Sequence, residues 1–358
     1  MKKTRILVIE DSLTVRKRLV EVLSAHEELE VVGEAEDGKS AIELCQKLRP
    51  DVITLDMMLP IMSGLAATEY IMAYCPTPIL IVSSSTNRGE LFKTYEALAA
   101  GAVDVLDKPN GDEKEDDWER RLTTAVRLVA RVKVITHPRA KFNLRNASSV
   151  SRQVDRESLS RTKYRLIAMG ASTGGPGAIL EILRGLPPDF PLPILLVLHL
   201  GQPFADTFAE WLDGQSPLRV AYAKHGDWLP RVGEGKVLMA PPDRHLVLSE
   251  GRLWLTEGPE RHSCRPSVDT LFESVAREMG AECAGFLMTG MGKDGAVGLL
   301  AIRQSGGATF AQDQETSVVF GMPREAAELG AAERVLPLHQ IAPTLIGLAG
   351  YPQARRRL

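Results

Sequence analysis

Residues 166–176 read LIAMGASTGGP, and this stretch decides the fold of the second half of the chain. An apolar run of strand type breaks into a Gly-x-Ser-x-Gly turn, and Pro176 then suits the first turn of a helix. A sharp strand-to-helix turn would lift the Ser172 hydroxyl clear of a sheet edge and direct backbone amides to one point, where an oxyanion could bind. Ser172 is therefore a candidate nucleophile. A phosphate-binding glycine loop or a plain turn is the alternative, because short glycine-rich matches are unspecific.

The sequence around this stretch has the alternation of an α/β protein. Short apolar runs alternate with amphipathic segments of helical period in the first 132 residues, and a second such pattern begins at Tyr164. This predicts two doubly wound domains, each with a parallel sheet covered by helices on both faces. The expected strands are residues 6–9, 31–32, 52–55, 79–82 and 103–106 in the first domain and residues 165–169, 194–198, 236–239 and 285–288 in the second. The second domain should also contain helices over residues 178–184, 204–212, 267–279 and 295–304 and a hairpin around Glu250-Gly251.

The segment between the two patterns is polar, basic and rich in serine. We expect domains over residues 1–125 and 164–350, joined by a linker over residues 126–163. Residues 351–358 are expected to form a solvated tail that ends in a short basic run. For the linker, solvation is favoured over docking on an acidic partner.

The composition describes a soluble protein of a reducing compartment. A content of 44% apolar and 25% charged residues is usual for globular proteins, and a formal net charge of -3 argues against nucleic-acid or membrane affinity of the whole molecule. The four cysteines are scattered without a CxxC motif or metal-ligand spacing, so we expect buried free thiols. The first apolar run is too short for a signal peptide, and no run approaches the roughly 20 apolar residues of a membrane span. These features predict a cytoplasmic protein with no membrane insertion.

Polar side chains follow four predicted strands of the first domain. They are Glu10 and Asp11 after the first strand, Asp56 after the third, Ser83 at the end of the fourth and Lys108 after the fifth. Because the carboxyl ends of parallel strands share one edge, these side chains should converge. The carboxylates of Glu10, Asp11 and Asp56 would suit Mg²⁺. The ion and Lys108 could neutralise a phosphoryl group on Asp56, and Ser83 could bind one of its oxygens. Unrelated polar groups at loop ends are the alternative.

Residues 1 to about 125 resemble a response-regulator receiver domain. The resemblance rests on the residues above together with the turn Leu59-Pro60 and Ser63-Gly64 and with Lys108-Pro109. It implies that Asp56 accepts a phosphoryl group from a partner histidine kinase, with Mg²⁺ as the cofactor. Receivers often carry an aromatic residue of the output switch shortly before the lysine. Val105 stands there in this chain, which argues against signalling by rotation of an aromatic side chain.

A serine nucleophile needs a base, and His199 is the best-placed histidine. It ends the apolar run 193–198 and so falls on the same sheet edge as Ser172. His225, His245 and His262 lie in more polar segments and are weaker candidates. A structural or surface role is the alternative for each of them.

The base needs an orienting carboxylate, for which Asp294 is the candidate. It lies in the glycine-rich turn 289–295 between a predicted strand and a predicted helix, where a helix N-cap is its alternative role. The loop around Met291 could supply a backbone N–H to the oxyanion. The chain order of serine, histidine and aspartate differs from the serine, acid and histidine order of the α/β-hydrolases, so that fold is not indicated.

The second half resembles the catalytic domain of the chemotaxis protein-glutamate methylesterases, the CheB family. The matching segments are residues 170–176, His199, residues 262–269 and residues 289–295. The resemblance implies phosphorylation-activated hydrolysis of glutamate methyl esters, and deamidation of glutamine, on methyl-accepting chemoreceptors. It implies Ser172 as nucleophile, His199 as base and acid, Asp294 as orienting partner and the Met291 amide as an oxyanion donor, with no cofactor for the esterase. Leu198 departs from the usual polar residue before the histidine, which affects local hydrogen bonding or substrate preference rather than the triad.

Two other functions are alternatives. The second half could be a non-enzymatic adaptor that binds a receptor or kinase under control of the phosphorylated receiver, although it would then need no activated serine. A DNA-binding response regulator is disfavoured, because the second half shows α/β alternation and no compact helix-turn-helix with a basic recognition helix.

Overall fold

The computed structural model describes residues 2–84, 87–109, 115–132, 134, 163–201 and 203–350. The chain divides into two compact units, residues 1–148 and 149–358, and each is described by itself. Residues 135–162 of the predicted linker, and the whole predicted tail, lie outside the described residues.

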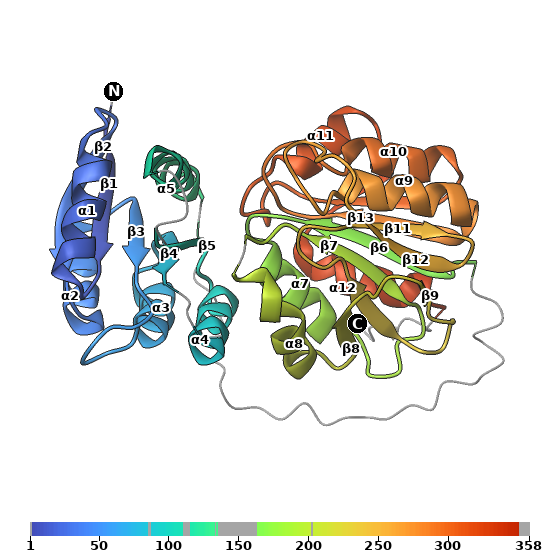
Figure 1. Ribbon diagram of the computed structural model, residues 1–358, viewed down its shortest axis with the longest axis horizontal. Helices are drawn as coiled ribbons and strands as arrows, with labels where there is room; N and C mark the ends of the chain where they lie inside the picture. The colour runs from blue at the N-terminus through green and yellow to red at the C-terminus, as the bar shows by residue number, and fades with distance from the viewer. Residues whose placement is uncertain are drawn as a thin grey trace, which may run out of the picture. The chain divides into compact units, whose positions relative to one another are not determined.

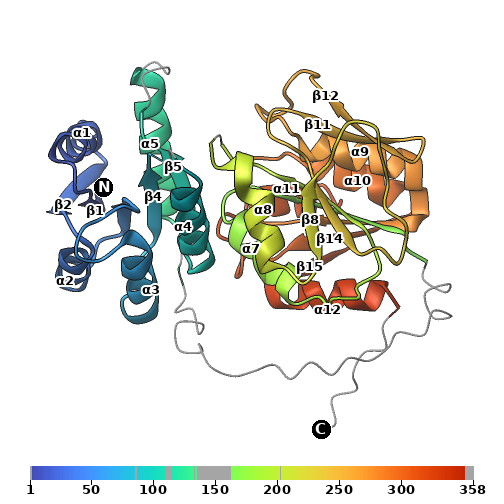
Figure 2. The ribbon, with the colours of Figure 1, turned by 60° about the horizontal axis from the view of Figure 1, so that its bottom comes forward.

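The described part of the first unit contains a five-stranded parallel sheet in the order β2-β1-β3-β4-β5 (Figure 1). Its strands are β1 (Thr4–Ile9), β2 (Leu29–Ala35), β3 (Val52–Leu55), β4 (Ile79–Ser83) and β5 (Asp104–Asp107). Its helices are α1 (Leu13–Ser24), α2 (Gly38–Leu48), α3 (Gly64–Tyr74), α4 (Arg88–Ala99) and α5 (Glu115–Val129). Helices α1 and α5 contact each other on one face, and α2, α3 and α4 follow one another on the other (Figure 2). This is the predicted doubly wound arrangement.

Local sequence explains how these elements form. Residues 6–9 of β1 are at most 1% exposed, because helices cover both faces, and such a strand reads as a continuous apolar run. Helix α2 begins after Asp37, whose carboxylate accepts hydrogen bonds from the backbone N–H groups of Lys39 and Ser40. Helix α3 begins after Ser63, whose hydroxyl accepts from the N–H of Ala66. The caps place the helix starts just beyond the strand ends that carry the polar residues.

The described part of the second unit contains a seven-stranded parallel sheet in the order β15-β14-β13-β6-β7-β10-β8 and a small antiparallel sheet in the order β11-β12-β9. The strands are β6 (Leu166–Ala171), β7 (Ile194–Leu198), β8 (Arg219–Tyr222), β9 (Asp227–Trp228), β10 (Lys236–Met239), β11 (His245–Ser249), β12 (Arg252–Thr256), β13 (Cys283–Leu287), β14 (Ala308–Gln312) and β15 (Arg334–Leu336). The helices are α7 (Gly175–Arg184), α8 (Ala205–Gln215), α9 (Val268–Met279), the short 3₁₀ helix η2 (Gly280–Glu282), α10 (Ala296–Gln304), α11 (Met322–Glu328) and α12 (Leu338–Leu348). Helices α9, α10 and α11 cover one face of the large sheet, and α7 and α12 cover the other (Figure 1).

The direction of the large sheet reverses at β6. The chain passes from β6 to its neighbour β7 on one side, and it later returns to place β13 on the other side of β6. In open parallel sheets, ligands bind beyond the carboxyl ends of the strands at such a reversal. The ends of β13, β6 and β7 therefore form the expected site.

The predicted strands and the predicted hairpin of the second domain are confirmed, with boundaries moved by up to two residues. Seven described elements of the second unit were not predicted individually beyond the alternation. They are β8, β9, β14, β15, η2, α11 and α12. Strand β14 mixes Thr309 and Gln312 into its apolar residues, and α12 contains Pro343, so local periodicity is weak in both. Within the described residues, no helix combines the length and the apolar character needed to cross a bilayer.

Candidate active site

Three adjacent strand ends bring the predicted catalytic residues of the second unit together. Ser172 directly follows β6, His199 directly follows β7, and Asp294 lies in the loop between β13 and α10. The backbone N–H of His199 donates to the carbonyl oxygen of Ala171 at 3.0 Å, and that of Ser172 donates to Thr289 O at 3.0 Å. These bonds tie the three loops to one another at the sheet edge.

His199 and Asp294 form a direct hydrogen bond. The Nε2–H group of His199 donates to Oδ2 of Asp294 at 3.0 Å. The side chain of Asp294 is 2% exposed and that of His199 is 15% exposed, so the pair is shielded from water on most sides. A buried carboxylate in this position holds the ring in one orientation and fixes the proton on Nε2.

Asp294 also accepts hydrogen bonds from the start of α9. Its carboxylate accepts from the Ser267 hydroxyl at 2.7 Å, from the Val268 N–H at 2.7 Å and from the Asp269 N–H at 3.1 Å. The N-terminus of a helix carries partial positive charge and free amides, which favour an ionised carboxylate. Asp294 is thus held as an anion facing His199. It lies just before α10, but its carboxylate binds the start of a different helix.

The contacts of this pair shift both pKa values. Burial lowers the pKa of His199, but the hydrogen bond to Asp294 and the contact with Cys264 outweigh it and raise the pKa to about 9. Burial raises the pKa of Asp294, but the hydrogen bonds from His199 and Ser267 outweigh it and lower the pKa below its ordinary value. Both shifts favour an imidazolium beside a carboxylate, the charge pair that forms when a histidine base takes up a proton.

Ser172 lies at the shared strand edge, close to the loop that carries Gly290 and Met291. A Cβ atom on Gly290 would lie 2.8 Å from Ser172 Cβ, so only glycine allows the two loops to approach this closely. Among the described residues, the Ser172 hydroxyl makes no hydrogen bond to His199, and the backbone N–H of Met291 has no partner. The Met291 amide is therefore available to an oxyanion, although catalytic hydrogen bonds often tighten only when substrate binds.

Cys264 is the main residue of this site that sequence reasoning missed. Its Sγ lies 3.7 Å from Nδ1 of His199, on the opposite side of the ring from Asp294. Cys264 is half-buried, so the expectation of buried thiols is wrong for this residue and is confirmed for Cys45, Cys75 and Cys283. No local signal could have placed it, because 65 residues separate it from His199.

The weaker histidine candidates have other contacts. Nε2 of His245 donates to the Pro259 carbonyl at 3.0 Å, and its Nδ1 accepts from the Ser267 N–H at 3.1 Å, so this ring supports the start of α9. Nε2 of His262 lies 3.1 Å from the buried carboxylate of Asp269. His225 lies at the surface, with Nδ1 3.2 Å from a carbonyl oxygen of β12.

The predicted acidic residues of the first unit also converge at a sheet edge. Carboxylate oxygens of Glu10, Asp11 and Asp56 lie within 4.8 Å of one another. Lys108 Nζ lies 2.7 Å from Glu10 Oε2 and 3.0 Å from Asp56 Oδ2. Burial raises the pKa of Glu10 despite the hydrogen bond from Lys108, and the nearby Asp56 charge adds to the increase.

This cluster fits Mg²⁺. The ion prefers a few hard carboxylate oxygens with room for water and phosphate, and Asp11 of the set is exposed to solvent. The buried hydroxyl of Ser83 has no hydrogen-bond partner among the described residues, so it could donate to a ligand atom. Glu10, Asp11 and Asp56 are therefore the residues that would hold the ion.

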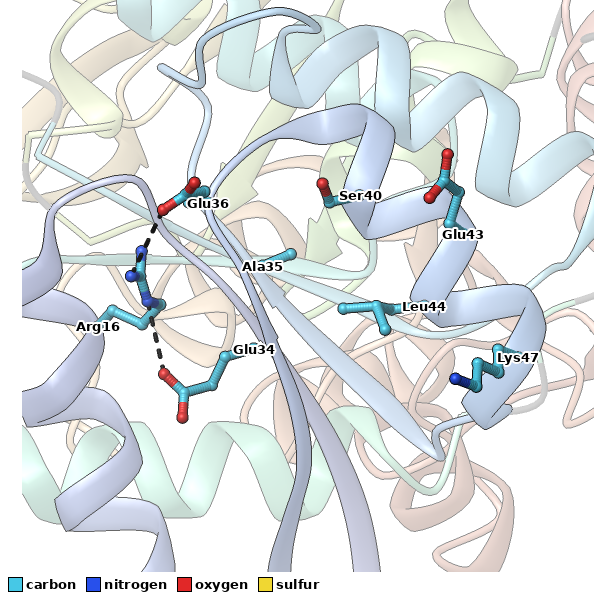
Figure 3. Close-up of a pocket in the computed structure, with 8 residues that line it drawn as sticks. All are labelled: Arg16, Glu34, Ala35, Glu36, Ser40, Glu43, Leu44 and Lys47. Atoms are coloured by element: carbon cyan, nitrogen blue, oxygen red, sulfur yellow. Dashed lines mark ion pairs between the residues drawn. The ribbon is translucent and has the colours of Figure 1, made fainter.

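A pocket lined largely by charged residues lies between α1, the end of β2 and α2 (Figure 3). The guanidinium group of Arg16 lies 3.5 Å from the carboxylate of Glu34 and 3.8 Å from that of Glu36. It also donates to the backbone oxygen of Glu10 at 2.6 Å. Arg16 thereby links the pocket to the end of β1, which Glu10 and Asp11 follow. The pocket is lined further by Ala35, Ser40, Glu43, Leu44 and Lys47.

Comparisons with known proteins assign both halves of the chain. Residues 167–345 match the CheB methylesterase family model, and residues 6–115 match the response regulator receiver domain model. The protein-glutamate methylesterase/protein-glutamine glutaminase 2 of Anaeromyxobacter dehalogenans (strain 2CP-C) is 43% identical over 337 residues, which cover 94% of each chain. The protein-glutamate methylesterase/protein-glutamine glutaminase of Nitrosospira multiformis is 42% identical over 347 residues, which cover 96% of each chain.

One solved structure is similar to part of the chain. The crystal structure of the Thermotoga maritima CheB methylesterase catalytic domain is 36% identical, with a TM-score of 0.49, and covers 52% of this chain and 98% of that one. From the family models and the full-length relatives, the chain belongs to the CheB methylesterase family of enzymes, with a response regulator receiver domain over residues 6–115.

Proposed function

We propose that the chain hydrolyses glutamate γ-methyl esters, and deamidates glutamine, on chemoreceptors, and that phosphorylation of Asp56 activates it. The observation that carries the proposal is the buried His199–Asp294 hydrogen bond of 3.0 Å beside Ser172, with the three residues following three adjacent strands. The names of the full-length relatives support the substrate class. The receiver domain supports a sensor histidine kinase as the phosphodonor.

In the first step, Ser172 Oγ attacks the ester carbonyl while His199 takes up its proton. Since Asp294 holds the proton on Nε2, the lone pair that accepts this proton is on Nδ1. The N–H of Met291 donates to the oxyanion that develops at the carbonyl oxygen. Asp294 stabilises the imidazolium, which then protonates the leaving methoxide oxygen as the C–O bond breaks, giving methanol and the acyl-enzyme.

In the second step, water hydrolyses the ester bond between the acyl group and Ser172. His199 removes a proton from the water, and it returns this proton to Ser172 Oγ when the tetrahedral intermediate collapses to the glutamate side chain of the receptor and the Ser172 hydroxyl. With a glutamine substrate, the same sequence releases ammonia in place of methanol. The chemistry of both reactions is acyl transfer, which is why one site can serve both.

In the receiver, Asp56 accepts the phosphoryl group. Mg²⁺, when bound by Glu10, Asp11 and Asp56, supplies positive charge that neutralises the incoming phosphoryl oxygens. Lys108 Nζ, 3.0 Å from Asp56, pairs with one oxygen of the product, and the unpartnered Ser83 hydroxyl donates to another. Phosphorylation thereby changes the partners of Lys108 and Ser83, which is the local event of the switch.

Replacing Asp56 with asparagine should remove the stimulation of esterase activity by a phosphodonor. The amide cannot form an acyl phosphate, so the rates with and without the phosphodonor should be equal. The measurement is methanol release from methylated receptor with each form of the protein. Glu69→Gln, which changes an exposed carboxylate of α3, should keep the full stimulation. A stimulated Asp56→Asn variant would contradict the role of Asp56.

The esterase rate should rise with pH from neutrality towards about pH 9. Since His199 has a pKa raised to about 9, most molecules carry a protonated ring at neutral pH, and a protonated ring cannot accept the serine proton. The measurement is kcat/KM against pH, with the spontaneous hydrolysis recorded for Ser172→Ala subtracted at each pH. A profile that is half-maximal near pH 6.5, the ordinary pKa of histidine, would show that the Asp294 contact does not raise the pKa of the base.

The proposed activity as a whole is tested by methanol release from candidate methylated receptors. Turnover on a receptor, together with labelling of Ser172 by a serine-directed phosphonate, is the expected result. If the receptor binds but no methanol is released and the serine resists labelling, the chain acts as an adaptor.

A further inference from the structure

Cys264 lies against the ring nitrogen of His199 that Asp294 leaves free. Its Sγ is 3.7 Å from Nδ1, and it also lies 3.4 Å from the His262 carbonyl oxygen. Of the four thiols, this is the one that is not buried, so an ion in solution can reach it. The role proposed for His199 in ester hydrolysis does not require a thiol at this position.

The state of the His199 ring suits a metal ligand. Nε2–H donates to Asp294, a carboxylate that is held as an acceptor by three further donors at the start of α9. In the neutral ring the lone pair is therefore on Nδ1, which faces Cys264. Histidines that bind metal ions in proteins commonly donate their other N–H to a carboxylate in this way, which fixes the tautomer and raises the basicity of the ligand.

Cys264 is held in place by a closed turn. The backbones of Arg261 and Cys264 exchange two hydrogen bonds, of 3.2 and 2.9 Å, around His262 and Ser263, whose φ angles are 53° and 59°. Both central residues are thus in the left-handed region, as in a tight two-residue hairpin turn. The turn is anchored to α9, because Arg261 donates two hydrogen bonds to Glu273, of 2.6 and 2.8 Å. Little ordering is therefore needed before Sγ can bind an ion.

The separation of the two ligand atoms matches a zinc site. With Zn–N of about 2.0–2.1 Å and Zn–S of about 2.3 Å, a tetrahedral angle places the nitrogen and the sulfur about 3.6 Å apart. Nδ1 and Sγ are 3.7 Å apart. An ion between them would need almost no movement of either side chain.

We infer that Nδ1 of His199 and Sγ of Cys264 form a binding site for a thiophilic divalent cation, and the chemistry of the pair selects Zn²⁺. Thiolate and imidazole are ligands that Zn²⁺ prefers, whereas Mg²⁺ prefers the carboxylate cluster of the receiver. Two water molecules complete the tetrahedron. Binding breaks the S–H bond of Cys264 and, where the ring is protonated, the Nδ1–H bond of His199. Both protons are released to solvent, and the imidazole enters as the neutral ligand. Asp294 remains hydrogen-bonded to Nε2 and does not bind the ion.

The consequence for the enzyme is inhibition. A cation on Nδ1 takes up the lone pair that would accept the proton of Ser172, so the acyl-enzyme cannot form. This consequence rests on the proposed function, whereas binding of the ion does not.

Binding is tested with Co²⁺, which reports on a sulfur ligand by its thiolate-to-metal charge-transfer absorption. The full chain, saturated with Mg²⁺, should develop this absorption with one equivalent of Co²⁺ and lose it when Zn²⁺ displaces the cobalt. Cys264→Ala should not develop the absorption, and the matched variant Cys283→Ala, which removes a buried thiol of β13, should retain it. Absence of the absorption in the unmodified chain, or its persistence in Cys264→Ala, would overturn the inference and leave an ordinary thiol–imidazole contact. This experiment needs no esterase activity, so it is independent of the proposed function.

Inhibition is tested by measuring the esterase rate at increasing Zn²⁺ concentration in the presence of excess Mg²⁺. The rate of each variant is compared with the rate of the same variant without zinc. The unmodified chain and Cys283→Ala should lose activity and regain it when a chelator is added. Cys264→Ala should need at least about tenfold more Zn²⁺ for the same loss, because one of its two protein ligands is gone. Equal sensitivity of Cys264→Ala and Cys283→Ala would show that the inhibiting ion binds elsewhere.

Discussion

Replacing Ser172 with alanine should lower kcat/KM for a glutamate methyl ester by roughly 10⁴-fold or more, the usual size of the loss when a catalytic serine is removed. The variant keeps the β6–α7 turn, because the bonds that hold residue 172 are made by its backbone: N–H to Thr289 O at 3.0 Å and its own carbonyl oxygen to Gly175 N–H at 2.6 Å. The Met291 amide and the His199–Asp294 pair also remain. The residual rate therefore reports what the oxyanion donor and substrate binding achieve without a nucleophile.

The measurement is single-turnover methanol release, with a search for the covalent acyl-enzyme after rapid quenching. The acyl-enzyme should be present in the unmodified chain and absent from Ser172→Ala. Ser305→Ala is the matched control, because Ser305 is an exposed residue at the end of α10 whose hydroxyl donates to the carbonyl oxygen of Ala301, and it should retain the full rate. A Ser172→Ala variant with more than a tenth of the normal rate would exclude Ser172 as the nucleophile.

Replacing Asp294 with asparagine should lower kcat/KM by roughly 10⁴-fold, although the shape of the side chain is almost unchanged. The carboxylate of Asp294 faces donors only: the Nε2–H of His199 and the amide of Val268 at one oxygen, and the Ser267 hydroxyl and the Asp269 amide at the other. An asparagine must point its NH₂ group at one of these pairs. If the NH₂ group faces His199, it donates to Nε2 and so favours the tautomer with the proton on Nδ1. A ring in that tautomer has no lone pair on Nδ1 to accept the proton of Ser172.

Two measurements separate this effect from loss of folding. Thermal unfolding should show a stability loss of about 1–3 kcal/mol, the cost of leaving a buried donor unpaired, which still leaves a folded enzyme. The rise of the pH profile should move to lower pH, because the Asp294 hydrogen bond is the largest of the contacts that raise the pKa of His199. Asp206→Asn, which changes an exposed carboxylate in the first turn of α8, should alter neither readout. Nearly normal activity of Asp294→Asn would assign Asp294 to the support of α9 alone.

Much of the fold was predictable because buried parallel strands are short, continuous apolar runs. Residues 194–198 and 236–239 were predicted with the boundaries that β7 and β10 have in the structure. Strands β14 and β15 were not predicted individually. Their positions depend on pairing with β13 and with each other, and the buried Gln312 of β14 is explained only by its hydrogen bonds to Thr289 and Thr316.

The proximity of the candidate residues in each unit was also predictable. A residue directly after a strand of a parallel sheet lies at the carboxyl edge, whatever the loops do. From this rule the sequence predicts that His199 lies near Ser172 and that Asp56 lies near Lys108. The roles of these residues stay proposals that the variants above test.

The sequence by itself determined the two α/β domains and the strand ends at which their polar residues gather, because strand and helix periods are local properties of the chain. Only the tertiary structure decided which nitrogen of His199 faces Asp294, that Asp294 is held by the start of α9, and that Cys264 faces the other nitrogen. These contacts join loops that are 26 to 95 residues apart. They depend on how α9 and the turn before it pack across the ends of β6, β7 and β13, and no local pattern of residues encodes that packing.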